Sequence, residues 1–524
     1  MEQPEGWSWQ DRAEGSIRRG TALDPSVEPV DGVRAFPTAY LQDRLLITQD
    51  QDTDQEAYDR EIRELRDAAG SFGWMLEIES PDALRAADPL VPGVPGFLRA
   101  RLTTPDEPTR GESPVPPDAW RVLQRARRSS RTWMPRTSLE HVLSIDPVGL
   151  NPFTRTNPFT RTNPFTRTNP VRGAGAGVGG SDDYLEPGRG ARQPVTWLGP
   201  APRRSAPPKR GRRPVVAVLD TGCGVHDWLP DDIVTRHVDI DGTPIGLTDD
   251  ADPERYPDLY GQLDGEIDAV AGHGTFIAGI IRQTAPDADI VSIRVAGALG
   301  VVDESRFLIA VAQVVELLRR HREDPSTGHP IDVLNLSLGY YHETPVDGQF
   351  SLTLNALLSA ARELGCVVVC SAGNDAIDRP SFPASLWPWP GADNGLPHDH
   401  DAPHVSVGAL NPSARSVALF SNVGPWVHVY APGAAVVSTS PAFVGGEQAT
   451  TRADIAGLRR ETIDPDDYRG GFSIWSGTSF AAPYVAGRVA AQLGTVPVQG
   501  ATAASAAKAV AAVLATLPAP KTGT

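Results

Sequence analysis

The C-terminal part of the chain, from about Pro214 onward, alternates short apolar runs with helical segments, and this alternation limits the possible folds most strongly. The runs are rich in β-branched residues and apolar on both faces, which suits strands buried inside a parallel sheet. The order predicts an α/β fold with an open, mostly parallel sheet and helices on both faces. The expected strands are 215–219, 290–295, 333–336, 367–371 and 405–407, and the expected helices are 275–282, 305–320, 352–364, 479–493 and 501–517.

The N-terminal part carries a different pattern. Its elements follow the order β-α-β-β-α-β, which is typical of a small α+β ferredoxin-like domain. We assign this domain to residues 41–148 and expect residues 1–40 to be poorly ordered. The expected strands are 43–50, 73–79, 97–103 and 141–145, and the expected helices are 55–69 and 118–129.

A long linker, 149–213, separates this domain from the C-terminal domain, 214–524. Three copies of NPFTRT fill residues 151–168, and a proline in each copy favours an extended spacer. A β-solenoid is the alternative, but three short turns could not bury a core. The basic, proline-rich stretch 203–213 suits a flexible tether, with a proteolytic processing site as the alternative.

Charge and hydropathy exclude several classes of partner. The chain has 48 Lys and Arg against 65 Asp and Glu, a net charge of −17, so neither nucleic acid nor an anionic membrane is an expected partner. Residues 1–20 lack the apolar core of a signal peptide, and no uncharged apolar run reaches the length of about 18 residues that a membrane-spanning helix needs. Cytoplasmic location is the default expectation, and leaderless export stays open. Three cysteines cannot form a disulfide framework.

Four motifs lie where an open α/β sheet places a functional site, at strand ends and helix starts. Each residue alone has an ordinary explanation, as a helix cap, a turn residue or a structural histidine. Together they supply a nucleophile, its base, the group that orients the base and an oxyanion donor. The motifs are VVAVLDTG with Asp220, GHGTFIAG with His273, SAGND with Asn374 and SGTSFAAPYVAG with Ser479.

These motifs resemble the signatures of the subtilisin-like serine proteases, the subtilases, over residues 214–494. The chain order Asp220, His273, Ser479 is also the order in subtilisin. The resemblance implies a serine endopeptidase with an acyl-enzyme mechanism. Ser479 would attack the peptide carbonyl, His273 would act as base, Asp220 would orient His273, and Asn374 with the Ser479 backbone N–H would bind the oxyanion.

The resemblance also implies how a polypeptide substrate binds. Ser337, Leu338 and Gly339 would pair with extended substrate backbone, and Ala372 and Gly373 would line the first specificity pocket. Asp375 beside that pocket is either a solvated turn carboxylate or the source of a preference for Arg or Lys before the cut.

The chemistry implied by the resemblance requires no cofactor, and we name no metal ligand. Acidic loops at 249–254 and 464–467 are candidates for a structural Ca²⁺, which the family often uses, but neither has the ligand spacing of a calcium loop, so this ion stays unassigned. Cys223, close to Asp220, is expected to be a packed thiol without a catalytic role.

The N-terminal domain resembles the propeptide that many subtilases use for folding and for blocking the cleft. Here a long linker intervenes, so the domain is a candidate intramolecular inhibitor or a recruiting module. Cleavage of the basic linker by the chain itself is a further hypothesis. Two competing functions are a catalytically silent peptide-binding module, disfavoured by the complete triad, and a sedolisin-type acid protease, disfavoured by the histidine of GHGT.

Overall fold

The fold was analysed in a computed structural model of the chain. The structure describes residues 3–17, 20–31, 35–49, 55–79, 90–105, 115–131, 134–145, 184, 188–261, 265–344, 352–390, 396, 402–446 and 448–520.

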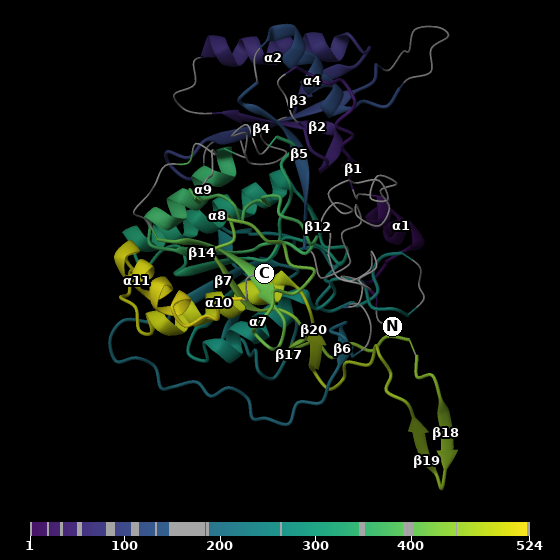
Figure 1. Ribbon diagram of the computed structural model, residues 1–524, viewed down its shortest axis with the longest axis vertical. Helices are drawn as coiled ribbons and strands as arrows, with labels where there is room; N and C mark the ends of the chain where they lie inside the picture. The colour runs from purple at the N-terminus through teal and green to yellow at the C-terminus, as the bar shows by residue number, and fades with distance from the viewer. Residues whose placement is uncertain are drawn as a thin grey trace.

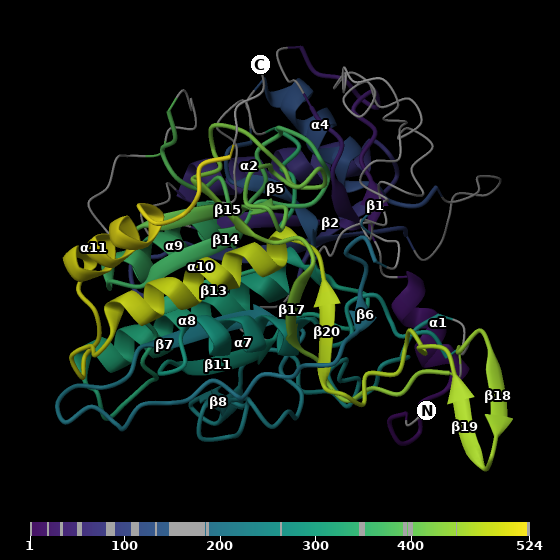
Figure 2. The same ribbon diagram turned by 60° about the horizontal axis from the view of Figure 1, so that its bottom comes forward.

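The C-terminal domain is built on a seven-stranded sheet in the order β16-β15-β14-β13-β7-β11-β8, visible behind the helices in Figure 2. Every neighbouring pair in it is parallel, so the strands end at one common edge. This confirms the predicted α/β class. The strands are β7 (Val215–Asp220), β8 (Val234–Thr235), β11 (Asp289–Arg294), β13 (Val333–Leu336), β14 (Val367–Ser371), β15 (His404–Leu410) and β16 (Val429–Pro432).

Helices cover both faces of this sheet because its strands are apolar on both sides. In β7, Val216 and Val218 pack in one core with α7, α10 and α11, whereas Val215, Ala217 and Leu219 pack in a second core with α8 and α9. This is the two-residue alternation of an extended strand. The helices are α7 (His273–Thr284), α8 (Glu304–Glu323), α9 (Leu352–Glu363), α10 (Thr478–Leu493) and α11 (Ala503–Leu514).

The N-terminal domain has its own antiparallel sheet, in the order β5-β2-β4-β3, with two helices on the side away from the C-terminal domain (Figure 1). Its elements follow the predicted β-α-β-β-α-β order, and Asp118 caps the second helix by accepting the N–H of Arg121 at 3.3 Å. The elements are β2 (Ala39–Gln49), α2 (Gln55–Gly70), β3 (Met75–Ile78), β4 (Gly96–Thr103), α4 (Ala119–Ser130) and β5 (Thr137–Ser144).

The expectation that residues 1–40 are poorly ordered is wrong for the described part of this segment. Helix α1 (Trp9–Ile17) docks on the C-terminal domain, where the Trp7 indole donates to the Leu259 carbonyl at 3.0 Å and buried Arg12 pairs with Asp258. Strand β1 (Thr21–Ala22) then pairs with β2. Trp7 and Arg12 therefore fix the segment. Single anchoring residues of this kind produce no periodic sequence pattern, so the sequence did not indicate an ordered segment.

The expected flexible linker also needs correction, because residues 188–213 lie on the C-terminal domain. Strand β6 (Gln193–Pro194) pairs with β20 (Phe472–Trp475), and the Arg192 guanidinium lies over the Trp475 ring, 4.7 Å from its centre. In the basic stretch, Arg204 pairs with Asp289 and Arg213 with Asp287. Three of the basic residues that suggested a solvated tether, Arg204, Arg212 and Arg213, pair with carboxylates, whereas Arg203, Lys209 and Arg210 are exposed. The NPFTRT repeats lie outside the described residues.

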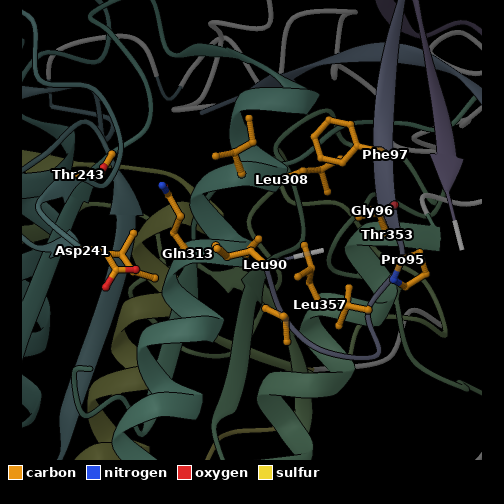
Figure 3. A pocket seen from close by; sticks show the side chains of 15 residues that line it. Leu90, Pro95, Gly96, Phe97, Asp241, Thr243, Leu308, Gln313, Thr353 and Leu357 are labelled. Atoms are coloured by element: carbon orange, nitrogen blue, oxygen red, sulfur yellow. The ribbon is translucent and has the colours of Figure 1, made fainter. Parts of the chain in front are cut away.

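Apolar packing joins the two domains. Leu46, Phe97 and Leu143 of the N-terminal sheet belong to the same core as Leu308 and Leu357 of α8 and α9. A cavity of about 170 Å³ remains in this interface, lined mainly by apolar side chains of both domains (Figure 3). Beside it, β12 (Val301–Asp303) pairs antiparallel with β5 and extends the N-terminal sheet by one strand of the C-terminal domain.

The remaining strands lie outside these layers. Strand β17 pairs with β20 next to α7, and the hairpin β18–β19 projects from the body of the molecule (Figure 1). None of the described helices has the length and apolar character required to cross a membrane. The strands are β9 (Asp239–Ile240), β10 (Thr243–Pro244), β17 (Val436–Thr439), β18 (Arg452–Ile455) and β19 (Leu458–Glu461).

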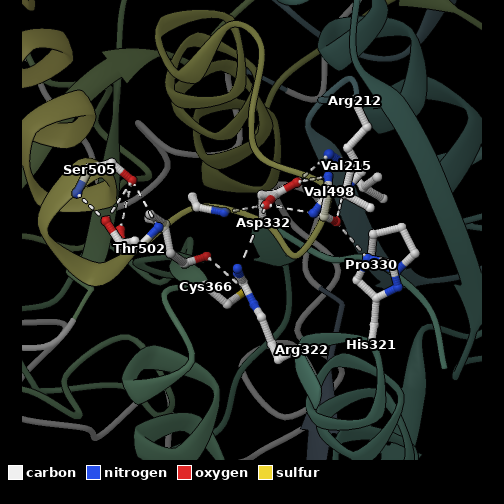
Figure 4. Close-up of polar contacts among 12 residues, drawn as sticks. Arg212, Val215, His321, Arg322, Pro330, Asp332, Cys366, Val498, Thr502 and Ser505 are labelled. Carbon is white, nitrogen blue, oxygen red and sulfur yellow. Dashed lines mark hydrogen bonds and ion pairs between the residues drawn. The ribbon is translucent and has the colours of Figure 1, made fainter. Parts of the chain in front are cut away.

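Asp332 ties three segments together at the amino ends of the strands (Figure 4). Its fully buried carboxylate accepts from both terminal nitrogens of Arg212 at 2.5 and 3.0 Å, from Val215 N at 2.9 Å and from Ala501 N at 3.2 Å. It therefore holds the end of the linker and the C-terminal extension against the start of β7.

Asp332→Asn is expected to lower the free energy of unfolding by about 2–3 kcal/mol, because a largely buried guanidinium loses its charged acceptor. Guanidinium chloride unfolding followed by tryptophan fluorescence measures the change. Arg204→Ala is the matched control: its partner Asp289 is 40% exposed, so this loss should stay below about 1 kcal/mol. Equal losses of unfolding free energy in both variants would contradict the role given to Asp332.

Candidate active site

Asp220 and His273 meet at the carboxyl edge of the sheet. Asp220 is the last residue of β7, His273 is the first residue of α7, and both are fully buried. The Nδ1 atom of His273 lies 2.8 Å from Oδ1 of Asp220, which also accepts the N–H of Thr221 at 2.8 Å. The carboxylate therefore fixes the orientation of the imidazole, with Nε2 on the opposite side of the ring.

Ser479 lies at the start of α10. The residue after it, Phe480, packs against His273, with 5.2 Å between the two ring centres. The Ser479 hydroxyl donates to the Ser337 carbonyl at 3.2 Å, and the buried Nε2 of His273 has no hydrogen-bond partner among the described residues. The predicted hydrogen bond between Asp220 and His273 is therefore present, whereas the one between Ser479 and His273 is absent. Such bonds are often long or absent in structures without substrate.

Asn374 follows β14 and lies beside the start of α10. Its Oδ1 accepts the N–H of Thr478 at 2.8 Å, which fixes the carboxamide next to Ser479. The residue is 8% exposed. The structure therefore brings all four predicted residues to one place.

The segment Ser337-Leu338-Gly339 continues β13 along the same edge, and the end of β5 already pairs with it. Ser144 N donates to Gly339 O at 2.9 Å, and Gly339 N donates to Ser144 O at 3.0 Å. On the other side, Ile145 N donates to Gly300 O at 2.7 Å. Ser144 lines the same cleft as Ser479, so a strand of the N-terminal domain lies where the sequence predicts extended substrate backbone.

Comparison with known proteins identifies the family. Residues 211–516 match the subtilase family, peptidase S8. The chain belongs to the subtilase family. It is 29% identical to an intracellular serine protease of Paenibacillus polymyxa, over 54% of this chain and 67% of that protein. It is 28% identical to subtilisin-like protease 4 of Arthroderma benhamiae, over 60% and 64%.

Solved structures include a cold-adapted subtilisin-like serine proteinase that is 23% identical, with a TM-score of 0.34, over 57% of this chain and 85% of that one. The chain spans about two thirds of the length of the curated relatives it matches. The subtilase domain has the fold described above, a parallel sheet with helices on both faces.

The walls of the cleft in the subtilase domain include the predicted pocket residues. Gly373 lines the cleft, and Ala372 is buried behind it. Asp375 also lines the cleft, and its Oδ2 accepts the Tyr341 hydroxyl at 2.5 Å. Asp375 is therefore an engaged, partly buried carboxylate and not the solvated turn residue of the first alternative.

His141 of β5 lies between two carboxylates of the subtilase domain. Its Nδ1 is 2.7 Å from Glu304 Oε2, its Nε2 is 2.7 Å from Glu343 Oε2, and all three residues are fully buried. Burial disfavours the imidazolium, but the charges of Glu304 and Glu343 outweigh it and raise the pKa of His141 to about 10. The ring is therefore a cation that joins the domains.

His342 completes the one group among the described residues whose His and Glu atoms lie close enough for a metal ion, together with His141 and Glu343. Burial lowers the pKa of His342 to about 4, so its ring is neutral. A doubly protonated His141 offers no lone pair to a metal. The group acts as an ion pair between domains.

The structure of the two acidic loops leaves a calcium ion unassigned. In the first, Asp249 pairs with Arg294 at 3.0 Å, and Glu254 points inward to hydroxyl and backbone donors. In the second, Asp467 pairs with Arg469 and Asp464 accepts backbone N–H groups. Asp466 keeps two buried carboxylate oxygens without a hydrogen-bond partner among the described residues. In the described part of the chain, no three acidic side chains of either loop lie close enough to share one ion, so no calcium ligand is assigned.

Cys223 behaves as predicted: burial raises the pKa of its thiol to about 12, so it is not a nucleophile. Sequence reasoning missed Glu254, which contacts both loops that carry Asp220 and His273. In the sequence, Glu254 was noted only as the last residue of the acidic loop 249–254. The threonines of DTG and GHGT, Thr221 and Thr275, were a signal that an acceptor lies between them.

Proposed function

We propose that the chain is a serine endopeptidase that hydrolyses peptide bonds through Asp220, His273 and Ser479. The observation that supports this most directly is the 2.8 Å bond between Asp220 and His273, with Ser479 and Asn374 beside it at the start of α10. Peptide hydrolysis by a serine nucleophile requires a carboxylate, an imidazole and a hydroxyl gathered in this way.

The reaction begins when the Ser479 hydroxyl turns from the Ser337 carbonyl toward Nε2 of His273. Nε2 takes the hydroxyl proton as Oγ bonds to the substrate carbonyl carbon, and Asp220 stabilises the imidazolium. The Asn374 amide and the Ser479 backbone N–H bind the oxyanion. His273 then gives its proton to the leaving amine, and water releases the acyl group from Ser479 by the same steps.

A polypeptide substrate would add a strand along Ser337–Gly339, with the residue before the cut against Ala372, Gly373 and Asp375. A preference for Arg or Lys would come from Asp375. Its bond to Tyr341 and the nearby guanidinium of Arg379, 5.0 Å from the Tyr341 ring centre, reduce the charge left for a substrate. We therefore expect this preference to be modest.

The N-terminal domain would act as an intramolecular inhibitor. Its strand β5 uses the backbone groups of Gly339 and Gly300 that a substrate strand would need. A recruiting module would have no reason to occupy the cleft. Inhibition would end when β5 leaves the cleft.

Self-processing would remove this inhibitor. The basic stretch 203–213 is a poor substrate for its own active site, because it lies at the amino ends of the strands. The 6 residues of β7 alone separate the two edges by about 20 Å. A cut within 146–187 would separate the domains and is the one we propose.

Mass spectrometry and a serine-directed fluorophosphonate test the function on the full chain and on Ser479→Ala. We expect the wild type to be labelled and cut between residues 146 and 187, and Ser479→Ala to be neither labelled nor cut. Labelling without a cut would refute self-processing alone. A folded wild type that is neither labelled nor cut, yet binds extended peptides, would favour the silent binding module.

A further inference from the structure

Glu254 is enclosed between the loop after β7 and the first turn of α7, which carry Asp220 and His273. It is 3% exposed. Its Oε1 contacts the Thr221 hydroxyl and accepts the N–H of Gly274 at 3.0 Å. Its Oε2 contacts the Thr275 hydroxyl and accepts the N–H of Thr275 at 3.3 Å. One side chain therefore joins the two segments that form the Asp–His pair.

These contacts complete a helix start that has no cap of its own. The N-cap position of α7 is Gly272, which has no side chain to accept the first N–H groups. Glu254, which lies far earlier in the chain, accepts two of them, from Gly274 and Thr275. The start of α7 and the ring of His273 on it are thereby fixed relative to β7.

The Thr221 hydroxyl has one proton and two acceptors, because its oxygen lies against Glu254 Oε1 and 3.1 Å from Asp220 Oδ1. If Glu254 is ionised, it draws this proton, and Asp220 loses a hydrogen bond. If Glu254 carries a proton on Oε1, it donates to Thr221, and Thr221 donates to Asp220. Asp220 Oδ1 also accepts from Nδ1 of His273 and from the N–H of Thr221, so it has partners in both arrangements, and only the second adds the Thr221 hydroxyl to them. The second arrangement also avoids two negative charges on carboxyl groups that share the one Thr221 hydroxyl in a buried site.

We propose that Glu254 is a positioning residue that acts as a neutral carboxylic acid and passes a hydrogen bond through Thr221 to Asp220. This inference rests on the proposed function of Asp220 and His273. Burial, with smaller contributions from the charges of Asp252 and Asp220, raises the pKa of Glu254 to about 8. Glu254 is then neutral at pH 7 and ionises on the alkaline side.

The other ionisable groups near Glu254 are Arg192 and the Cys223 thiol. The positive charge of Arg192 favours the ionised carboxylate, whereas burial opposes it. The thiol stays neutral in the range where Glu254 titrates. Loss of the Glu254 proton therefore both removes the hydrogen bond from Thr221 to Asp220 and adds a negative charge close to the Asp–His pair.

The Nδ1 proton of His273 reports this change without any need for catalysis. In a ¹⁵N-histidine-labelled Ser479→Ala chain, its NMR resonance, assigned by its loss in His273→Gln, should shift with a midpoint near pH 8. Glu254→Gln cannot ionise, so its resonance should show no shift near pH 8. A shift of the same midpoint and size in Glu254→Gln would overturn the proposal.

Activity gives a second readout. With Ser479 present, Glu254→Gln should stay within about threefold of wild type in kcat/KM at pH 7 and lack an inflection that the wild type shows between pH 7 and 9. Glu254→Leu should lower kcat about 10- to 100-fold with KM unchanged, from loss of the positioning bonds. If Glu254→Leu does not fold, Glu254→Gln alone decides.

Thr275→Val is the matched control, because it removes a hydroxyl bond to Glu254 but leaves the path through Thr221. It should lower thermal stability and keep the shift near pH 8. A wild type that neither hydrolyses peptides nor reacts with the fluorophosphonate would refute the proposed protease, and the NMR titration would still decide the role of Glu254. Identical pH profiles for wild type and Glu254→Gln would refute the positioning role alone.

Discussion

Alanine at His273 and alanine at Ser479 are each expected to lower kcat about a million-fold, the size of the loss measured in subtilisin itself. The two side chains act as one unit, because the hydroxyl is a poor nucleophile without the base and the base has no proton to take without the hydroxyl. The double variant should therefore lose no more than either single one. Hydrolysis of a chromogenic peptide, with active sites counted by the fluorophosphonate, measures the effect.

His226→Ala is the control for this comparison. His226 lies near Cys223, but its ring bonds to the Gly471 carbonyl at 2.9 Å and the N–H of Trp228 at 3.0 Å, away from the triad. It should change kcat only a few-fold. Activity of His273→Ala within tenfold of wild type, or additive losses in the double variant, would contradict the mechanism.

His141→Ala is expected to release the N-terminal domain from the cleft. It removes the cation between Glu304 and Glu343 and leaves two buried carboxylates without their partner. Breaking a buried pair in this way costs about 3–5 kcal/mol, which would raise the open population at least 10²-fold. Labelling of Ser479 in the full chain should accelerate accordingly.

The same contact makes docking depend on pH. The pKa of His141 is about 10 in the docked state against an ordinary value of 6.5, so its contribution is full below 6.5 and is lost as pH rises through 10. Burial alone would raise the pKa of Glu343, but the positive charge and the hydrogen bond of His141 outweigh it and lower this pKa, so the second contribution fades as pH falls below the ordinary value of 4.5. Docking should be strongest between these two ordinary values, and the wild type should open as the medium becomes alkaline.

Hydrogen exchange of β5 in the Ser479→Ala background, corrected for intrinsic rates, measures docking without self-digestion. Protection of Ser144 and Ile145 should fall from pH 7 to 10 in the wild type and be low at every pH in His141→Ala. His321→Ala is the matched control, since the ring of this buried histidine bonds to the Val498 carbonyl at 2.9 Å, within the subtilase domain. Unchanged protection in His141→Ala would refute the view that this ion pair holds the two domains together.

Local sequence signals predicted the helices and strands well, and they indicated the residues that we propose as a triad. The apolar runs that became β7, β13 and β14 are short and lack polar faces, so their burial in a parallel sheet followed directly. Asp220 and Asn374 follow such strands, and His273 and Ser479 begin helices, so their meeting at one edge follows from the topology. The order of the N-terminal elements was equally readable from their periodicity.

Contacts between distant segments were not readable in this way. The pairing of β5 with β12 and Gly339 joins residues of ordinary strand composition that carry no mark of their partner. Charged residues that become buried look like surface residues in a sequence, which is why His141 and Glu254 were not recognised. The docking of α1 depends on two anchors, Trp7 and Arg12, that no repeat reveals.

The covalent connection between β5 and the subtilase domain sets how release could be controlled. A strand that belongs to the same chain meets the cleft at a fixed effective concentration, of the order of millimolar for a flexible connection. Dilution therefore does not empty the cleft, and a free competitor that binds as tightly as β5 must exceed this concentration to enter. If β5 acts as the proposed inhibitor, a cut within 146–187 would convert a first-order rebinding into a second-order one, so a single scission would let concentration decide whether the cleft is occupied.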